Sequence, residues 1–228
     1  MGAVIVPAAV PVVAALGTPA AHAVRYPIIL TDDTVRAYGP VMFIGDSTSS
    51  LRYRTMKQEI AAFGVGPFRL DLTPGRSIAR TLRGRPSAID AVRMARADGF
   101  DPNVYVVALG YPDIIRWENN PTPAQTVSSI RQLIIPLLQE IGSDRLVAFF
   151  NLYSVSRTRA GVFNTALSSL LPEWPNLHIV DWAALARRHR RWHSRDGYHF
   201  GYTGAKQRTN FIGRTLRDMV TLRRSVAE

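Results

Sequence analysis

The sequence predicts an α/β fold built on a parallel sheet of five strands with helices on both faces. Short, strongly apolar segments recur along the chain, and the segments between them repeat apolar residues at the spacing of an α-helix. Strands that alternate with helices in this way favour a parallel sheet with right-handed crossovers. The length of 228 residues suits one domain, and we find no internal repeat or inner linker.

The predicted strands are short but differ in pattern. Val41–Ile44 and Val104–Leu109 are uniformly apolar, as expected for buried strands, whereas Phe68–Leu72 alternates. The full set covers residues 41–44, 68–72, 104–109, 146–150 and 177–180. Residues 24–39 show neither pattern, and we expect them to be irregular.

The predicted helices follow the apolar spacing of 3.6 residues. They cover residues 48–63, 87–97, 123–141, 158–171, a segment that starts at 182, and residues 204–222. Ser87 is expected to cap the second helix, and Gly99 lies beyond its end. Pro136 should kink or split the third helix, because proline lacks an N–H and its ring clashes with the preceding turn.

The first 23 residues differ from the rest of the chain. They contain no charged side chain, are rich in Ala, Val and Pro, and end in Ala21-His22-Ala23. This small-x-small ending is typical of a signal peptide, here cleaved after Ala23, although no Lys or Arg precedes the apolar run. An apolar anchor and a disordered tail are the alternatives. We expect residues 24–228 to form the domain and the protein to be secreted or associated with the cell envelope.

Several site chemistries are excluded or disfavoured by residue content. The chain has no cysteine, which excludes disulfides, thiolate catalysis and cysteine-based zinc sites. It also lacks a His-Glu-x-x-His pattern, a close acidic cluster, a phosphate-binding loop with lysine and a dinucleotide fingerprint. We therefore expect no metal and no cofactor.

The chain is strongly basic, with a net charge of +11. Such a surface should attract anionic partners, and anionic lipid or an acidic envelope polymer suits an exported protein best. The stretch Arg187-Arg188-His189-Arg190-Arg191 is able to contact phosphates, but no nucleic-acid-binding motif surrounds it. We expect no specific nucleic-acid partner. A solvated helix end is an equally good interpretation of this stretch.

A candidate nucleophile follows the first predicted strand. Gly45-Asp46-Ser47 comes directly after Val41–Ile44, so Ser47 lies at a strand-to-helix turn. Glycine permits a tight turn, and the free N–H groups of the next helix are able to stabilise an oxyanion. The alternative is that Ser47 or Thr48 only caps a helix. Asp46 is expected to bond nearby backbone and serve as a scaffold.

A candidate base lies in a loop before the last helix. His199 follows Asp196 by three residues in a segment rich in Gly and Tyr. An Asp-x-x-His turn lets the carboxylate bond one imidazole nitrogen, while the other nitrogen takes a proton from serine. A plain Asp-Gly turn with a surface histidine is the alternative.

Together the two motifs resemble the SGNH hydrolases, also called the GDSL esterase/lipase family. The resemblance covers residues 41–216 and includes the order of the motifs. It implies a single-domain α/β/α sandwich of the flavodoxin-like type. It also implies that Ser47 is the nucleophile, His199 the general base and Asp196 its orienting partner.

The resemblance implies further site residues at the carboxyl ends of the strands. A glycine N–H after the second strand belongs to the oxyanion hole of the family, and Gly75 fits that place with Arg76 beside it. Without this context, Pro74-Gly75 is an ordinary turn. Tyr111 and Asn151 follow the third and fourth strands, and we assign them to substrate binding. The nearby Trp117 and Tyr153 either line a pocket or pack locally.

The sequence departs from the family after the third strand. The family has Gly-x-Asn-Asp there, whereas this chain has Gly110-Tyr111-Pro112-Asp113. Proline offers no side-chain donor to an oxyanion, and loss of one donor costs about 2.7–4 kcal/mol of transition-state stabilisation. Three outcomes are open: Asn119, Asn151 or Arg76 replaces the donor, catalysis is slower or uses an unusual acceptor, or activity is lost. Asp113 is expected to be structural.

The motifs therefore predict an exported serine esterase or lipase that hydrolyses carboxylic esters of lipids or carbohydrates. Two alternatives remain. An O-acyltransferase of cell-envelope glycans would share the acyl-enzyme but pass the acyl group to a sugar hydroxyl. A binding module without catalysis would use the basic surface to hold anionic polymers.

Overall fold

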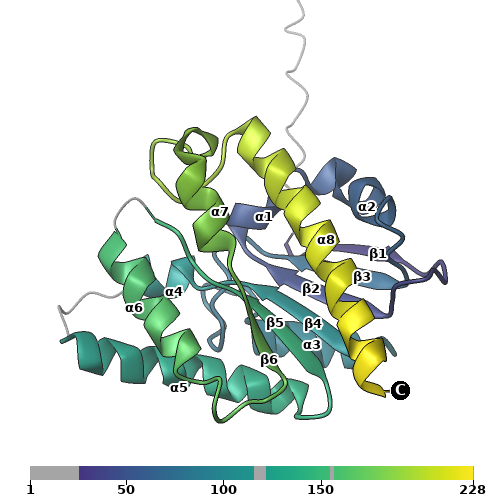
Figure 1. Cartoon of the computed structure of the whole chain (residues 1–228), viewed down its shortest axis with the longest axis horizontal. Helices are drawn as coiled ribbons and strands as arrows, with labels where there is room; N and C mark the ends of the chain where they lie inside the picture. The colour runs from purple at the N-terminus through teal and green to yellow at the C-terminus, as the bar shows by residue number, and fades with distance from the viewer. Residues whose placement is uncertain (1–25, 116–121, 155–156, 228) are drawn as a thin grey trace, which may run out of the picture.

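A computed structural model describes residues 26–115, 122–154 and 157–227, in which helices cover both faces of one sheet (Figure 1). The strands are β1 (Ile28–Asp32), β2 (Val41–Gly45), β3 (Phe68–Leu72), β4 (Val104–Ala108), β5 (Leu146–Phe150) and β6 (Leu177–Val180). The predicted signal peptide, residues 1–23, lies outside the described residues.

The sheet has six strands rather than five, in the order β1-β3-β2-β4-β5-β6. All neighbours are parallel except β1, which runs antiparallel to β3 and pairs Ile28 with Leu72 and Asp32 with Phe68. The prediction that residues 24–39 are irregular was wrong for β1. This edge strand pairs on one side only and keeps Ile29 and Thr31 exposed, so it lacks the uniform apolar pattern of the central strands.

The helices form two layers with separate cores. Their bounds are α1 (Ser47–Ser50), α2 (Tyr53–Ala61), α3 (Ala88–Ala97), α4 (Tyr111–Ile115), α5 (Pro123–Ile141), α6 (Arg157–Ser168), α7 (Trp182–Arg188), the 3₁₀ turn η1 (Arg190–Trp192) and α8 (Tyr202–Ala227). One core joins the sheet to α3, α4, α5 and α6, and the other joins it to α2, α7 and α8. Successive residues of β2 alternate between the cores, with Met42 in the first and Phe43 in the second.

Most predicted helices are present, with local differences. Ser87 caps α3 as predicted, in a capping box with Asp90. Pro136 lies inside α5, which is not split. The predicted helix 48–63 is two helices, because the chain leaves helical geometry at Arg52, where φ is −106° and ψ is 22°. No helix in the described part of the chain is long and apolar enough to cross a membrane.

Candidate active site

The loop after β2 lies near the middle of the sheet, where β2 is flanked by β3 and β4. Asp46 is fully buried and caps α1: one of its carboxylate oxygens accepts hydrogen bonds from Thr48 N (2.8 Å) and Thr48 Oγ1 (2.7 Å). Burial raises the pKa of the Asp46 carboxyl, and the bonds from Thr48 oppose this effect. Asp46 is therefore a scaffold group, as predicted, and it fixes the turn that presents Ser47.

Ser47, His199 and Asp196 form one chain of hydrogen bonds. Ser47 Oγ lies 2.8 Å from His199 Nε2, and His199 Nδ1 lies 2.6 Å from an oxygen of Asp196. The ionised carboxylate only accepts hydrogen bonds, so Nδ1 carries the proton and Nε2 accepts from the serine hydroxyl. The structure thus brings together three residues that are far apart in the sequence and that the two motifs singled out.

The loop that carries Asp196 and His199 is held by its own backbone. Ser194 N donates to His199 O (2.9 Å), and Asp196 Oδ1 accepts from the backbone N–H groups of Tyr198 (3.1 Å) and His199 (2.9 Å). Partial burial raises the pKa of Asp196, but its hydrogen bonds, led by that from the His199 ring, outweigh this and lower it to about 2. Asp196 is therefore ionised near neutral pH and fixes the tautomer of His199.

The loop after β3 lies beside the Ser47 turn. Thr73 N donates to Gly45 O (3.0 Å), and a turn closed by Arg76 N and Thr73 O (3.1 Å) follows. Gly75 occupies this turn with φ of +73°, and a Cβ there would lie 2.4 Å from an Arg85 nitrogen. The positive φ favours glycine here, whereas the nearby Arg85 guanidinium is the end of a flexible side chain that is able to move.

The Arg76 side chain lies in the interior rather than at the site. It is fully buried, and its guanidinium donates to Asp71 Oδ1 (2.6 Å), Thr73 Oγ1 (2.6 Å) and Pro86 O (3.1 Å). These bonds hold the ends of the loop that contains Gly75. The structure therefore contradicts a direct contact between Arg76 and substrate, and it assigns the side chain a supporting place.

Tyr111 and Asn151 also bond to protein groups. The Tyr111 hydroxyl donates to Tyr153 O, and its ring stacks on Tyr198 with a centroid distance of 5.5 Å. The Asn151 amide donates to Asp181 (2.8 Å) and accepts from Ala183 N (2.7 Å), so it ties β5 to the start of α7. The Tyr111 hydroxyl is thus occupied within the protein, and the Asn151 amide uses its oxygen and one of its two N–H donors to hold the start of α7.

The segment that follows β4, residues 110–113, is short and has a structural role. Gly110 has φ of +128°, and a Cβ would lie 2.6 Å from the Phe163 ring. Asp113 accepts from the Ser77 hydroxyl and from Ile78 N (3.2 Å), which ties α4 to the loop after β3, as expected for a structural residue. Pro112 lies in α4 between these residues. Trp117 and Asn119 lie outside the described residues.

Arg208 is a buried residue near the site that the motifs did not indicate. It is 2% exposed, its Nε donates to Ser49 Oγ (3.2 Å), and its guanidinium lies 4.7 Å from the Trp182 ring centroid and 5.4 Å from that of Phe200. Its spacing from Ala205 and Ile212 in the sequence places it on the apolar face of α8, and this was the available signal.

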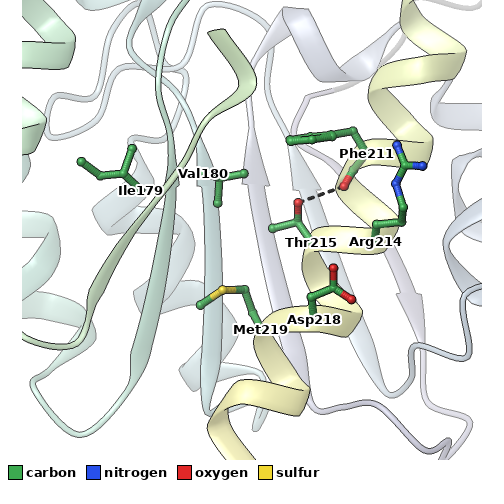
Figure 2. Close-up of a pocket in the computed structure, with 7 residues that line it drawn as sticks. All are labelled: Ile179, Val180, Phe211, Arg214, Thr215, Asp218 and Met219. Atoms are coloured by element: carbon green, nitrogen blue, oxygen red, sulfur yellow. Dashed lines mark hydrogen bonds between the residues drawn. The ribbon is translucent and has the colours of Figure 1, made fainter. Parts of the chain in front are cut away.

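A separate hollow lies at the edge of the sheet. It has a volume of about 350 Å³ and is lined from β6 and α8, with Phe211, Thr215 and Met219 along the helix (Figure 2). None of the residues that line it belongs to the group of Ser47, Asp196 and His199. Among the residues that the structure describes, no three His, Asp or Glu side chains are grouped to hold a metal ion.

Comparisons with known proteins place this fold. Neither a scan against protein-family models nor a search of curated proteins gave a match. Among solved structures, the catalytic domain of peptidoglycan O-acetyltransferase A from Streptococcus pneumoniae, with a methylsulfonyl adduct, has a TM-score of 0.57 at 16% identity. That alignment covers 84% of this chain and 97% of that chain.

Two further structures extend the comparison. A G-D-S-L family lipolytic protein from Veillonella parvula has a TM-score of 0.55 at 11% identity, covering 77% of this chain and 95% of that chain. A carbohydrate esterase of family 3 from Talaromyces cellulolyticus has a TM-score of 0.53 at 19% identity, covering 79% and 97%. Like these structural neighbours, the chain has the fold of the SGNH/GDSL hydrolases.

Proposed function

We propose that this protein is an exported serine ester hydrolase that acts on carboxylic esters of carbohydrates or lipids. The observation that carries the proposal is the hydrogen-bond chain from Ser47 Oγ through the His199 ring to Asp196. A serine hydroxyl is a weak nucleophile until a base removes its proton, and this arrangement supplies a base that is already oriented.

The proposed reaction has two steps. Ser47 Oγ attacks the acyl carbonyl carbon while His199 Nε2 takes the hydroxyl proton, and Asp196 stabilises the resulting imidazolium. The bond from carbon to the alcohol oxygen then breaks, and His199 gives the proton to the departing alcohol. Water, activated by the same imidazole, next attacks the acyl-enzyme and releases the carboxylic acid.

Backbone donors are the proposed oxyanion hole. The Ser47 N–H opens α1, so no residue earlier in that helix accepts it. The Gly75 N–H lies in the loop that Thr73 ties to Gly45. Because Pro112 replaces the expected asparagine, these two N–H groups carry the charge of the tetrahedral intermediate without that side chain, and a lower turnover follows.

An O-acyltransferase of cell-envelope glycans is the second candidate. It is favoured by the structural neighbour from Streptococcus pneumoniae, which is a peptidoglycan O-acetyltransferase. Product analysis with and without a sugar acceptor separates the candidates. Release of free acid at every acceptor concentration excludes transfer, whereas acylated sugar that increases with acceptor supports it.

Labelling with a fluorophosphonate probe tests the proposal. The probe should modify Ser47, as mapped by mass spectrometry, and Ser47→Ala and His199→Ala should abolish or strongly reduce labelling. Ser50→Ala is a matched control from the same helix, since its hydroxyl only bonds Ser47 O (3.4 Å), and it should label normally. No labelling of the folded protein, or equal labelling of Ser47→Ala, would rule out an activated Ser47.

A further inference from the structure

The segment before the candidate base carries an unusual concentration of positive charge. Five arginines lie within nine positions between the end of α7 and Asp196, and all five are exposed: Arg187, Arg188, Arg190, Arg191 and Arg195. Within the described part of the chain, none of them pairs with an acidic side chain. We call this group the arginine cluster.

The arginine cluster is fixed next to the candidate active site. Gly201 N donates to Trp192 O (2.9 Å), and His193 bridges to Phe200, so η1 is joined to the start of α8. His199 lies inside this closed loop. The arginine cluster therefore belongs to the segment that leads directly into the loop with the candidate base, and that segment is joined to the start of α8.

A hollow lies on the other side of the start of α8. It has a volume of about 300 Å³ and is lined by Leu51–Thr55 and Tyr202. Leu51 follows Ser47 by one helical turn, and Tyr202 follows His199 by three residues, so the hollow adjoins the site. In Figure 1, α2 and α7 lie on opposite sides of the first turns of α8.

The side chains of the hollow suit a sugar ring beside an anionic group. Tyr202 is 73% exposed, and the Arg52 guanidinium lies 4.8 Å from its ring centroid, which holds the ring in place. Arg52 itself pairs with Glu59. Arg54 is exposed, bonds only the neighbouring Tyr53 hydroxyl (3.2 Å) and has no acidic partner among the described residues, so its charge remains available.

From this arrangement we propose that the rim of the site binds an anionic polysaccharide that extends across Ser47 in both directions. This inference rests on the proposed esterase and deepens it. The acylated sugar unit lies at Ser47, a neighbouring unit lies on Tyr202 and Arg54, and the chain continues over the arginine cluster. The substrate is an ester on a polymer that carries carboxylate or phosphate groups.

A polymer fits these observations better than a bilayer surface. Insertion into a bilayer needs apolar side chains that project from the surface. Here the exposed apolar side chains next to Ser47 and His199, Leu51 and Tyr202, line a hollow that also contains Arg52, Arg54 and Thr55. Charge on both sides of the site matches a ligand whose negative groups repeat along its length.

Binding of labelled polygalacturonate to full-length Ser47→Ala protein tests the proposal. Fluorescence anisotropy should show binding that weakens steeply with salt, as expected when arginines displace counterions from a polyanion. Arg190→Gln/Arg191→Gln/Arg195→Gln should weaken it at least about tenfold and reduce the salt dependence. Arg54→Gln and Tyr202→Ala should each weaken binding several-fold, since they act on the other side of the site.

The matched control removes the same charge elsewhere. Arg93, Arg131 and Arg217 are engaged in ion pairs on other helices, so their replacement by Gln keeps the net charge of the two triple variants equal. Only the variant in the arginine cluster should lose binding. Circular dichroism establishes that both variants are folded.

Three results would overturn the proposal: equal weakening by the control, equal binding of neutral dextran, or preference for phosphatidylglycerol vesicles over polygalacturonate. The fluorophosphonate experiment keeps this test separate from that of the esterase. Labelling of Ser47 without polyanion binding would refute only the polysaccharide surface. Binding without labelling would support the surface and refute the esterase.

Discussion

Replacement of Arg76 by methionine should destabilise the protein severely. The Arg76 and Asp71 side chains are both fully buried, and the guanidinium makes hydrogen bonds to Asp71 Oδ1 (2.6 Å), Asp71 O (3.1 Å), Thr73 Oγ1 (2.6 Å) and Pro86 O (3.1 Å). Methionine fills much of the same space but leaves the Asp71 charge buried without its partner. Removing one partner of a buried ion pair costs about 3–5 kcal/mol.

The expected loss is large enough to measure by thermal unfolding. For a chain of this size, each kcal/mol shifts Tm by about 2–4 °C, so Arg76→Met should lower Tm by about 6–20 °C. Asp71→Asn/Arg76→Met, which removes both charges, should recover part of this loss. Circular dichroism at 222 nm follows the helices of both layers during unfolding.

Arg93→Met is the matched control for this prediction. Arg93 also pairs with a carboxylate, that of Glu140 (2.7 Å), but its side chain is 64% exposed. Exposed ion pairs contribute about 0–1 kcal/mol, so Tm should change little. If Arg76→Met unfolds within about 2 °C of the wild type, or if Arg93→Met loses as much, the argument from burial fails.

Three other predictions concern the site and its supports. Gly110→Ala should cost at least about 2 kcal/mol in chemical denaturation, because its φ of +128° and the Phe163 ring exclude a methyl group; Gly161→Ala, with open space in α6, should stabilise by about 0.5–1 kcal/mol. Asp196→Asn should lower kcat for a chromogenic ester by about 10⁴-fold. Asp196→Asn should also be less stable than the wild type at pH 6, and this difference in the free energy of unfolding should disappear as pH falls from 3.8 to about 2. The reason is that folding lowers the pKa of Asp196, so its carboxylate contributes stability only while it is ionised. A constant difference across this range in urea unfolding would contradict the prediction. Ser87→Ala should cost about 1 kcal/mol through loss of the cap of α3, measured by thermal unfolding, and an unchanged Tm would contradict it.

The central strands of the sheet could be predicted from the sequence because each has a recognisable pattern of apolar residues. The strands β2, β4 and β5 are buried and strongly apolar, β6 is apolar at three of its four residues, and β3 alternates, so their patterns identify them. The edge strand β1 was missed because its pairing with β3 comes from tertiary contact and its outward positions are exposed. The break at Arg52 was missed because Leu51, Met56 and Ile60 still follow helical spacing across it.

The residues of the candidate site could be predicted where they belong to short sequence motifs. Asp196 and His199 lie in one turn, and Ser47 follows a strand, so their spacing carried the information. The contacts of Arg76, Tyr111 and Asn151 were not predictable from the sequence. A position just after a strand does not determine whether the side chain points into the site or into the protein interior. Each of these three bonds to protein groups from segments that only the folded chain brings near.

The hydrogen bond between Ser47 and His199 joins positions that are 152 residues apart, whereas the bond between His199 and Asp196 spans three. The base and its partner therefore lie together in the loop at residues 193–201. One hydrogen bond joins this loop to the serine, and ring contacts of Tyr198 with Tyr111 and of Phe200 with Trp182 also hold it. Local opening of that loop would separate the two halves while the six-stranded sheet stays intact. Heating should therefore abolish the proposed esterase activity at a lower temperature than that of global unfolding. The activity would then report on the docking of the C-terminal segment rather than on unfolding of the whole domain.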